Sequence, residues 1–193
     1  DVNHNWKALQ YKLRTLYDDV MVSMILRDES VEVKLVSGLP DMVEGMLEVD
    51  LVGFDGSTTR VFSRSMGLPA GGSKDVLLLP LDSLEATMDV SSVFLQSRFV
   101  VDGKATYENR MFLMPFGQLN LPDVDVRVLS VERKEKTVDF GYDRNLTKEG
   151  YAIHLHASDY AAHVQLYLEE SHGWFEDNFF HLLPGDSRVI FCQ

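Results

Sequence analysis

The sequence predicts an all-β protein made of two tandem immunoglobulin-like β-sandwiches, preceded by one N-terminal α-helix. Three observations predict this fold class. Apolar residues recur at helical spacing in the segment 5–17, near the start of the chain. From Val20 onward they recur in short runs with strand-like alternation, separated by turn signals. The segment 113–122, with two prolines and a glycine, interrupts this pattern as a linker between two domains would.

The segment 5–17 predicts an amphipathic helix. Its apolar side chains recur at spacings of three and four residues, which places them on one helix face; they are Trp6, Leu9, Leu13 and Leu16. Asn3 or Asn5 can cap the start of this helix. We expect the apolar face to pack against the first sandwich or, alternatively, to belong to the interface with a domain outside this chain, in which case part of it is exposed here. We assign residues 1–19 to this helical segment.

The segment 20–117 predicts the first sandwich, with seven strands. In the run 31–35, valine and leucine alternate with charged residues, as in a strand with one buried face. An Asp-Gly pair at 55–56 and another at 102–103 each give a two-residue hairpin signal between two runs. After a first strand from Val20, the runs lie at 31–35, 47–51, 58–65, 76–79, 92–101 and 105–114.

The segment 118–193 predicts a second, smaller sandwich. A charged segment at 132–136 separates its first two apolar runs and is interpreted as a turn. Six strands are one fewer than a full sandwich of this type needs, so we expect the native chain to continue beyond Gln193. The six runs lie at 124–131, 137–142, 151–156, 163–168, 179–183 and 187–191.

The composition limits the classes of partner. The chain has 193 residues and a formal net charge of −12, and an acidic surface repels phosphate groups. We therefore expect neither nucleic acid nor membrane as a partner, whereas neutral sugars and other protein domains are compatible with this charge. Cys192 is the one cysteine, which excludes an intramolecular disulfide. No apolar run approaches the ~18 residues of a membrane-spanning helix.

The acidic residues form no recognisable catalytic pair. A glycosidase needs two carboxyl groups about 5 to 9 Å apart, one of them with a raised pKa. The adjacent residues Asp18-Asp19 and Glu169-Glu170 would point to opposite faces of a strand. No glycine-rich loop has phosphate-binding spacing, and no serine lies in a nucleophile-elbow sequence. We expect no catalytic residue and no cofactor in this chain.

Three histidines are candidate metal ligands. His154 and His156 share one face of a predicted strand, and His163 falls on the next predicted strand. The alternative is a polar outer face of the sandwich, with Ile153 and Leu155 turned inward. We favour the polar face and predict no metal site.

The aromatic residues between Gly173 and Phe180 allow two interpretations. Aromatic ring faces can stack on pyranose sugars, and an acidic protein tolerates a neutral sugar. Alternatively, these rings form the core of a small domain that has few other large residues. Trp174 follows a Ser-His-Gly loop and is the ring most expected to be exposed. It is therefore our candidate for a contact with substrate sugar.

Asn145 begins the triplet Asn-Leu-Thr, an N-glycosylation sequon in a polar, turn-like setting. The sequon has a physical consequence only in a secretory protein of a eukaryote. Asn145 is a glycosylation candidate under that condition alone.

Two sequence motifs resemble one enzyme family. The segment 174–186 reads Trp-Phe-Glu-Asp-Asn-Phe-Phe-His-Leu-Leu-Pro-Gly-Asp. It resembles the signature of the last immunoglobulin-like domain of glycoside hydrolase family 2 β-mannosidases and the related exo-glucosaminidases. The segment 5–11, Asn-Trp-Lys-Ala-Leu-Gln-Tyr, resembles the helix that closes the catalytic barrel of those enzymes. The two motifs stand in the family's order and enclose nearly the whole chain.

The resemblance implies a parent enzyme that removes terminal β-linked mannose, or glucosamine, by a retaining mechanism with two carboxylates and no metal. The family carries both catalytic glutamates in the barrel, so no position of this chain inherits them. The chain would then be a structural accessory region, with the barrel and an oligosaccharide as its partners. The implied compartment is the lysosome for a eukaryotic parent, and the periplasm or cytoplasm for a bacterial one.

Two other classes of function stay open at this stage. The chain could be a carbohydrate-binding module, in which Trp174 would be required for sugar binding. It could instead be a protein-interaction sandwich of an adhesion or receptor protein. The helix at 5–17 stands against the second alternative, because such proteins rarely place a helix before a sandwich.

Overall fold

The structure is a computed structural model that describes residues 6–86, 88–101, 105–139, 145–169 and 173–193. The chain divides into two compact units. The central unit comprises Leu13–Leu121. The terminal unit comprises Asp1–Lys12 together with Pro122–Gln193. Each unit is described by itself below.

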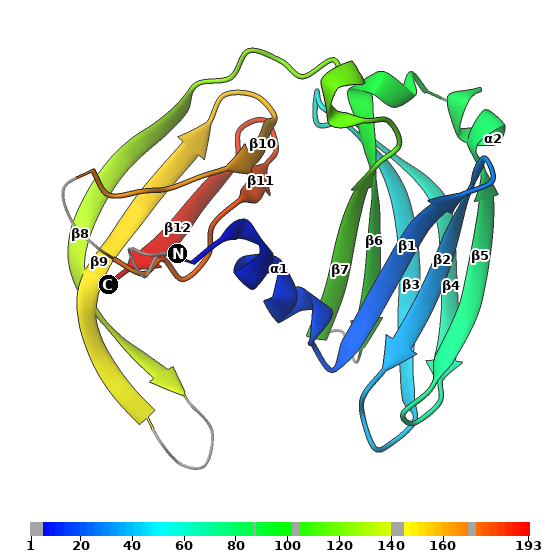
Figure 1. Cartoon of the computed structure of the whole chain (residues 1–193), viewed down its shortest axis with the longest axis horizontal. Coiled ribbons are helices and arrows are strands. Elements are labelled where there is room, and N and C mark those ends of the chain that lie inside the picture. The colour runs from blue at the N-terminus through cyan, green and yellow to red at the C-terminus, as the bar shows by residue number, and fades with distance from the viewer. Residues whose placement is uncertain (1–5, 87, 102–104, 140–144, 170–172) are drawn as a thin grey trace. The chain divides into compact units, whose positions relative to one another are not determined.

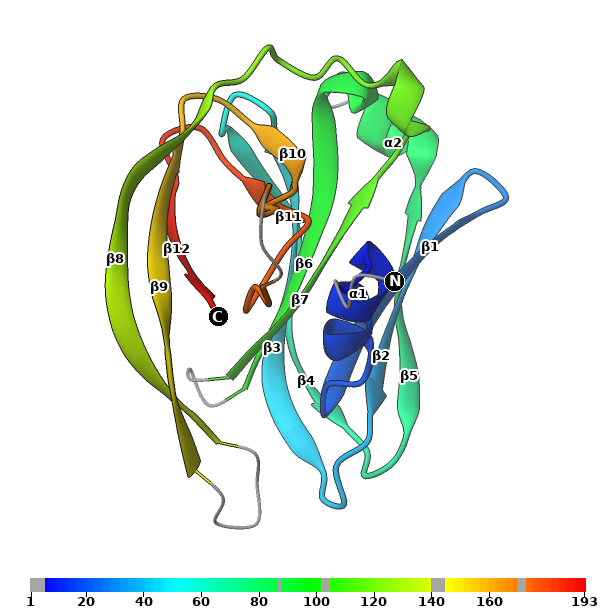
Figure 2. The ribbon, with the colours of Figure 1, turned by 60° about the vertical axis from the view of Figure 1, so that its left-hand side comes forward.

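The central unit is a sandwich of two antiparallel sheets (Figures 1 and 2). The three-stranded sheet has the order β1-β2-β5 and the four-stranded sheet the order β4-β3-β6-β7. The seven strands predicted between Val20 and Phe116 are therefore all present. They are β1 (Val20–Arg27), β2 (Ser30–Ser37), β3 (Val43–Gly53), β4 (Thr58–Leu68), β5 (Ser73–Pro80), β6 (Val93–Val101) and β7 (Ala105–Phe112).

Alternation along these strands builds the core of the central unit. Val31, Val33 and Leu35 of β2 are buried, as are the leucines and valine of β3 at alternate positions. The predicted hairpin at 55–56 joins β3 to β4 through a three-residue loop closed by a hydrogen bond from Gly53 N–H to the Ser57 carbonyl, with Gly56 in the left-handed region at φ 85°. The second hairpin signal, at 102–103, lies outside the described residues. Three short helices complete the unit: α2 (Leu81–Glu85), η1 (Val90–Ser92) and η2 (Phe116–Gln118).

The terminal unit also contains two sheets. Its larger sheet has the order β12-β9-β8 and its smaller sheet pairs β10 with β11 (Figure 1). Small and apolar side chains from both sheets fill the core, with Leu155, Leu182 and Ile190 at its centre. The strands are β8 (Val126–Asp139), β9 (Asn145–Ala157), β10 (Ala161–Val164), β11 (Phe180–Leu182) and β12 (Ser187–Cys192).

The predicted charged turn at 132–136 is wrong. These residues lie in the middle of β8, and each pairs with a residue of β9. Backbone pairing with β9 accounts for the difference, because it continues through all five charged-segment residues; Arg133 Nη2 in addition lies 2.5 Å from a Glu149 carboxylate oxygen. Charged residues on a strand with two exposed faces leave no apolar alternation for the sequence to display. The two runs predicted at 124–131 and 137–142 are therefore one long strand.

The helix α1 (Ala8–Leu16) buries a different face from the predicted one. Tyr11 is 7% exposed, whereas Leu9 is 64% and Leu16 40% exposed. The boundary between the two units falls within this helix, after Lys12. Tyr11 packs in the terminal unit, so the predicted placement against the first sandwich is wrong for this part of the helix. Among the described residues, no helix is both long and apolar enough to cross a membrane.

Candidate ligand-binding site

The backbone of residues 174–176 extends the larger sheet of the terminal unit. Trp174 N–H donates to the Gln193 carbonyl oxygen at 2.7 Å, and Gln193 N–H donates back to Trp174 at 2.9 Å. Glu176 N–H donates to the Phe191 carbonyl at 2.8 Å. These bonds place the segment beside the free edge of β12 and hold the aromatic residues of the motif in fixed positions.

Asn178 makes the turn that follows. Asp177 Oδ1 accepts a hydrogen bond from Asn178 N–H at 2.9 Å, and Asn178 Oδ1 accepts one from Phe179 N–H at 3.0 Å. The same side chain also holds the backbone of Leu166: its Oδ1 accepts from Leu166 N–H at 2.7 Å and its Nδ2 donates to the Leu166 carbonyl at 2.8 Å. Asn178 is 7% exposed, so these bonds are shielded from water.

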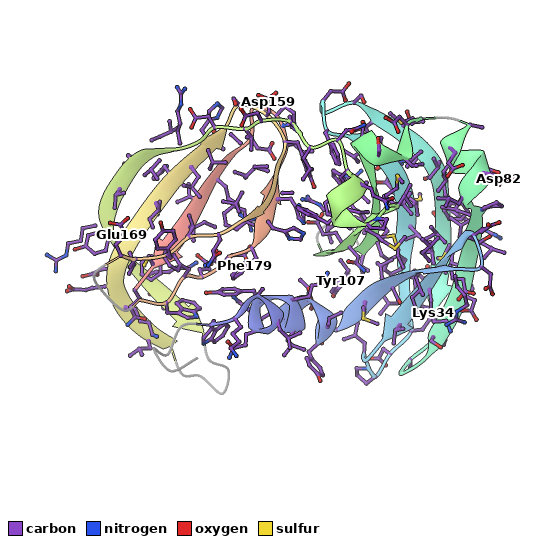
Figure 3. All side chains as sticks on the ribbon, turned by 45° about the horizontal axis from the view of Figure 1, so that its top comes forward. Lys34, Asp82, Tyr107, Asp159, Glu169 and Phe179 are labelled. Carbon is purple, nitrogen blue, oxygen red and sulfur yellow. The ribbon has the colours of Figure 1, made fainter. Side chains whose placement is uncertain are left out.

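Tyr11 joins this region from the other end of the chain. Its hydroxyl donates to the Phe175 carbonyl at 3.3 Å, and its ring centroid lies 6.1 Å from that of Phe179. The Phe179 side chain is labelled in Figure 3. The Trp6 ring also lies beside Tyr11, with 5.5 Å between the ring centroids. Phe175 is 5% and Phe180 6% exposed, which confirms the core interpretation for these two rings.

Trp174 is half-buried rather than exposed. Its ring meets the Trp6 ring edge-on at a centroid distance of 5.9 Å. The Lys148 ammonium group lies 5.9 Å from the centroid of the Trp174 ring, within the range of a cation–π contact. The role of Trp174 in sugar contact stays a prediction.

A pocket of about 310 Å³ opens next to Trp174, but Trp174 does not line it. Three segments form its walls: the start of the chain up to Tyr11, the segment 165–168 and the segment 173–179. The Asn178 bonds to Leu166 hold the second of these segments against the third. The lining residues are Trp6, Lys7, Ala8, Tyr11, Gln165, Leu166, Tyr167, Leu168, Gly173, Phe175, Asn178 and Phe179.

Sequence reasoning did not find this pocket. The segment 165–168 was assigned to a strand, whereas β10 ends at Val164 and residues 165–168 belong to no strand. Tyr167 is consequently 69% exposed at the pocket. The residues 165–168 read Gln-Leu-Tyr-Leu, which alternates as a half-buried strand does, so the local sequence contains no signal against a strand.

The candidate metal ligands separate into two places. His154 and His156 lie on β9, whereas His163 lies on β10 in the other sheet. The His163 ring centroid is 4.6 Å from that of His181, whose Nδ1 is 2.9 Å from the Tyr160 hydroxyl. Within the described part of the chain, no three His, Cys, Asp or Glu residues have a metal-binding arrangement.

The acidic residues of interest are mostly exposed or engaged in ion pairs. Asp18, Asp19 and Glu169 are exposed, and Glu170 lies outside the described residues. Asp50 is 2% exposed and contacts both Arg60 and Arg98, whose Nη2 is 3.0 Å from an Asp50 carboxylate oxygen. The hydrogen bond to Asp50 is the main reason why the pKa of Arg60 is raised. The contacts of Asp50 with two arginines are typical of a structural ion-pair cluster.

Two further residues bear on the sequence analysis. Asn145, the glycosylation candidate, is the first residue of β9, and its side chain lies outside the described part of the chain. Cys192 is 4% exposed, and burial raises the pKa of its thiol. A buried thiol of this kind is poorly reactive.

Comparison with protein-family models assigns both halves of the chain. Residues 29–116 match the model of the mannosidase Ig/CBM-like domain, and residues 122–193 match the model of the Ig-fold domain of mannosidases. The chain carries two mannosidase-type Ig domains. This finding confirms the resemblance to β-mannosidases and the all-β, tandem Ig-like fold class.

A solved structure shows the same fold. The mannosidase-type Ig domains align with the crystal structure of β-D-mannosidase from Dictyoglomus thermophilum at a TM-score of 0.67 and 22% identity, over 95% of this chain and 20% of that chain. The chain thus spans about a fifth of the length of that enzyme. Red sea bream transglutaminase aligns over 90% of this chain and 27% of its own at 11% identity, with a TM-score of 0.38 that carries no argument. No curated protein sequence matches the chain.

Proposed function

We propose that this chain is the non-catalytic C-terminal region of a β-mannosidase-like glycoside hydrolase. The observation that carries the proposal is the consecutive order of the two mannosidase-type Ig domains. The alignment with 20% of the D. thermophilum β-D-mannosidase supports it, because most of that enzyme has no counterpart in this chain. The catalytic barrel of the same protein is then the principal partner of the chain.

The proposed parent enzyme hydrolyses terminal β-D-mannosides with retention of configuration. That reaction uses two carboxyl groups about 5 to 5.5 Å apart, one as nucleophile and one as acid and base. On this proposal, both belong to the barrel. The carboxylates Asp50, Glu149 and Asp177 of this chain have arginine partners, which fits structural roles.

The proposal includes a division of the chain. Residues 1–19 are the helical end of the catalytic barrel, residues 20–117 the first Ig-like domain, and residues 118–193 the second. Trp174 is the residue we propose for contact with the oligosaccharide. The compartment follows the source: the lysosome in a eukaryote, where Asn145 would be glycosylated, and the periplasm or cytoplasm in a bacterium.

The test of this function is an activity measurement. The purified 193-residue chain is incubated with an aryl β-D-mannopyranoside, and release of the aryl alcohol is followed by absorbance. We expect no turnover above the rate in buffer. A complete β-mannosidase serves as the positive control. Turnover that co-elutes with the chain through two chromatography steps contradicts the proposal.

A carbohydrate-binding module is the second candidate function, and the aromatic pocket of the terminal unit favours it. Five aromatic residues line the pocket, and the Trp174 ring lies next to one of them. On this alternative, Trp174→Ala abolishes sugar binding. Unchanged binding by that variant contradicts the role of Trp174.

A further inference from the structure

We propose that the pocket of the terminal unit is a binding site for a neutral hexopyranose, separate from Trp174. This proposal goes beyond the proposed function, because binding at this pocket requires neither a catalytic domain nor a particular parent reaction. All the lining residues belong to the terminal unit. The terminal unit therefore contains every lining residue that the structure describes.

The size and walls of the pocket suit one sugar ring. Its volume of about 310 Å³ is at the small end of the range for small-molecule sites, which begins at about 300 Å³. The rings of Trp6, Tyr11, Phe175 and Phe179 contribute aromatic surface. An aromatic ring has an electron-rich face, which attracts the polarised C–H groups on the apolar face of a pyranose.

The polar groups at the pocket match sugar hydroxyls. Among the described residues, none forms a hydrogen bond or an ion pair with the side chain of Gln165, Tyr167 or Lys7. A glutamine amide and a tyrosine hydroxyl each both donate and accept, as sugar hydroxyls do, and a lysine donates. Asn178 differs, since its side chain is already bonded to the backbone of Leu166. Asn178 therefore shapes the wall, and Gln165 and Tyr167 bind the ligand.

The charge of the lining selects a neutral ligand. Among the residues that the structure describes, no aspartate or glutamate lines the pocket, and Lys7 is the one charged residue there. Recognition of a carboxylate or phosphate typically uses the paired donors of an arginine, and the described lining residues include no arginine. The net charge of −12 of the whole chain further disfavours an anionic ligand.

The experiment is an NMR titration of the full 193-residue chain. Methyl β-D-mannopyranoside, methyl β-D-glucopyranoside and mannobiose are added up to roughly ten times a dissociation constant in the millimolar range, which corresponds to about −4 kcal/mol. We expect saturable shifts of the backbone amides at 165–168 and 173–179 and of the Trp6 indole N–H. The absence of saturable shifts with all three sugars overturns the proposal.

Variants separate this pocket from other sites. Tyr167→Ala removes a side chain that is 69% exposed, so the fold should be unaffected. We expect it to weaken binding about tenfold, the loss of one hydrogen bond to the sugar, and we expect Gln165→Ala to weaken binding in the same direction. The matched control is Tyr151→Ala, which removes a tyrosine 52% exposed on β9 that does not line the pocket.

Three results contradict the proposal at this stage. Unchanged affinity in both Tyr167→Ala and Gln165→Ala would place the sugar elsewhere. Loss of binding in Trp174→Ala alone would support the sugar contact named under the proposed function and reject the pocket. Binding of glucuronate, but of none of the neutral sugars, would reject the neutral ligand class. None of these three binding results changes the expected outcome of the aryl mannoside assay. The pocket proposal can therefore be rejected without rejecting the proposed function.

Discussion

Asn178 shows how a single side chain assembles one wall of the pocket. Its amide oxygen accepts hydrogen bonds from Leu166 and Phe179, and its amide nitrogen donates to Leu166. A buried backbone group that loses its partner is destabilising by about 1–3 kcal/mol. No other side chain of the described residues satisfies both backbone groups of Leu166. The position of the segment 165–168 therefore depends on this residue.

We predict that Asn178→Ala lowers the free energy of unfolding of the terminal unit by about 2–4 kcal/mol, because it leaves the backbone N–H and C=O of Leu166 unpaired. Urea unfolding followed by Trp fluorescence measures the change. Asn178→Asp is the matched variant: it keeps the accepting oxygens but loses the donor, and should be intermediate. Equal stability of wild type and Asn178→Ala would show that the Leu166 backbone finds other partners.

At the scale of elements, two strands of the central unit approach too closely for a side chain at Gly45. A Cβ atom at this position of β3 would lie 2.6 Å from Phe99 Cζ and 2.7 Å from the Val100 carbonyl oxygen, both in β6. Phe99 is fully buried and Val100 contributes backbone, so neither can move cheaply. The glycine is therefore required by the packing of β6 rather than by its own φ angle.

We predict that Gly45→Ala destabilises the central unit by about 1–3 kcal/mol through this overpacking. Gly117→Ala is the control, since no atom lies within 4 Å of a Cβ at Gly117 and the residue belongs to the same unit. That control should change the free energy of unfolding by less than about 0.5 kcal/mol. Thermal unfolding by circular dichroism compares the two, and an equal melting temperature for both variants would refute the close-approach argument.

The strand β8 is the element that sequence reasoning divided incorrectly. Its first part alternates valine with polar residues, and the alternation then stops in the charged segment 132–136. The strand continues because the pairing with β9 continues through Asp139↔Asn145. Hydrogen bonding to a neighbouring strand involves the backbone of any residue type. A strand can therefore extend beyond the segment in which apolar residues alternate.

At the scale of the whole molecule, the terminal unit joins the two ends of the chain. Tyr11 and Phe175 are separated by 164 residues, yet the Tyr11 hydroxyl donates to the Phe175 carbonyl. Contacts of such sequence separation carry a high loop-closure cost. The N-terminal segment is therefore part of the C-terminal fold and contributes to its stability.

We predict that Tyr11→Ala lowers the free energy of unfolding of the terminal unit by about 3 kcal/mol, the loss expected for a buried aromatic side chain. Leu9→Ala lies on the same helix, and its side chain is 64% exposed, so it should change stability by less than about 0.5 kcal/mol. Guanidinium unfolding of both variants gives the comparison. A larger effect of Leu9→Ala would restore the predicted apolar stripe as the buried face.

The fold class and most element positions are readable in the sequence, because they depend on short-range patterns. Alternation in the segment 20–117 and glycine-containing turns mark seven strands without knowledge of their partners. The motif at 174–186 similarly identifies the type of the second domain. In each case the signal lies within about a dozen neighbouring residues, where sequence spacing and spatial direction are coupled.

The buried face of α1 and the pocket depend on partners remote in sequence. The helical spacing of Leu9 and Leu16 predicts that both are buried, yet both are exposed. Tyr11 is buried instead, because its hydroxyl has a carbonyl acceptor and its ring has an aromatic neighbour in the segment 173–179. The periodicity of the sequence predicts which residues share one face of a helix. It does not predict which face another segment of the chain will cover. Shape and hydrogen-bond complementarity between remote segments make that choice, and it is expressed only in the folded chain.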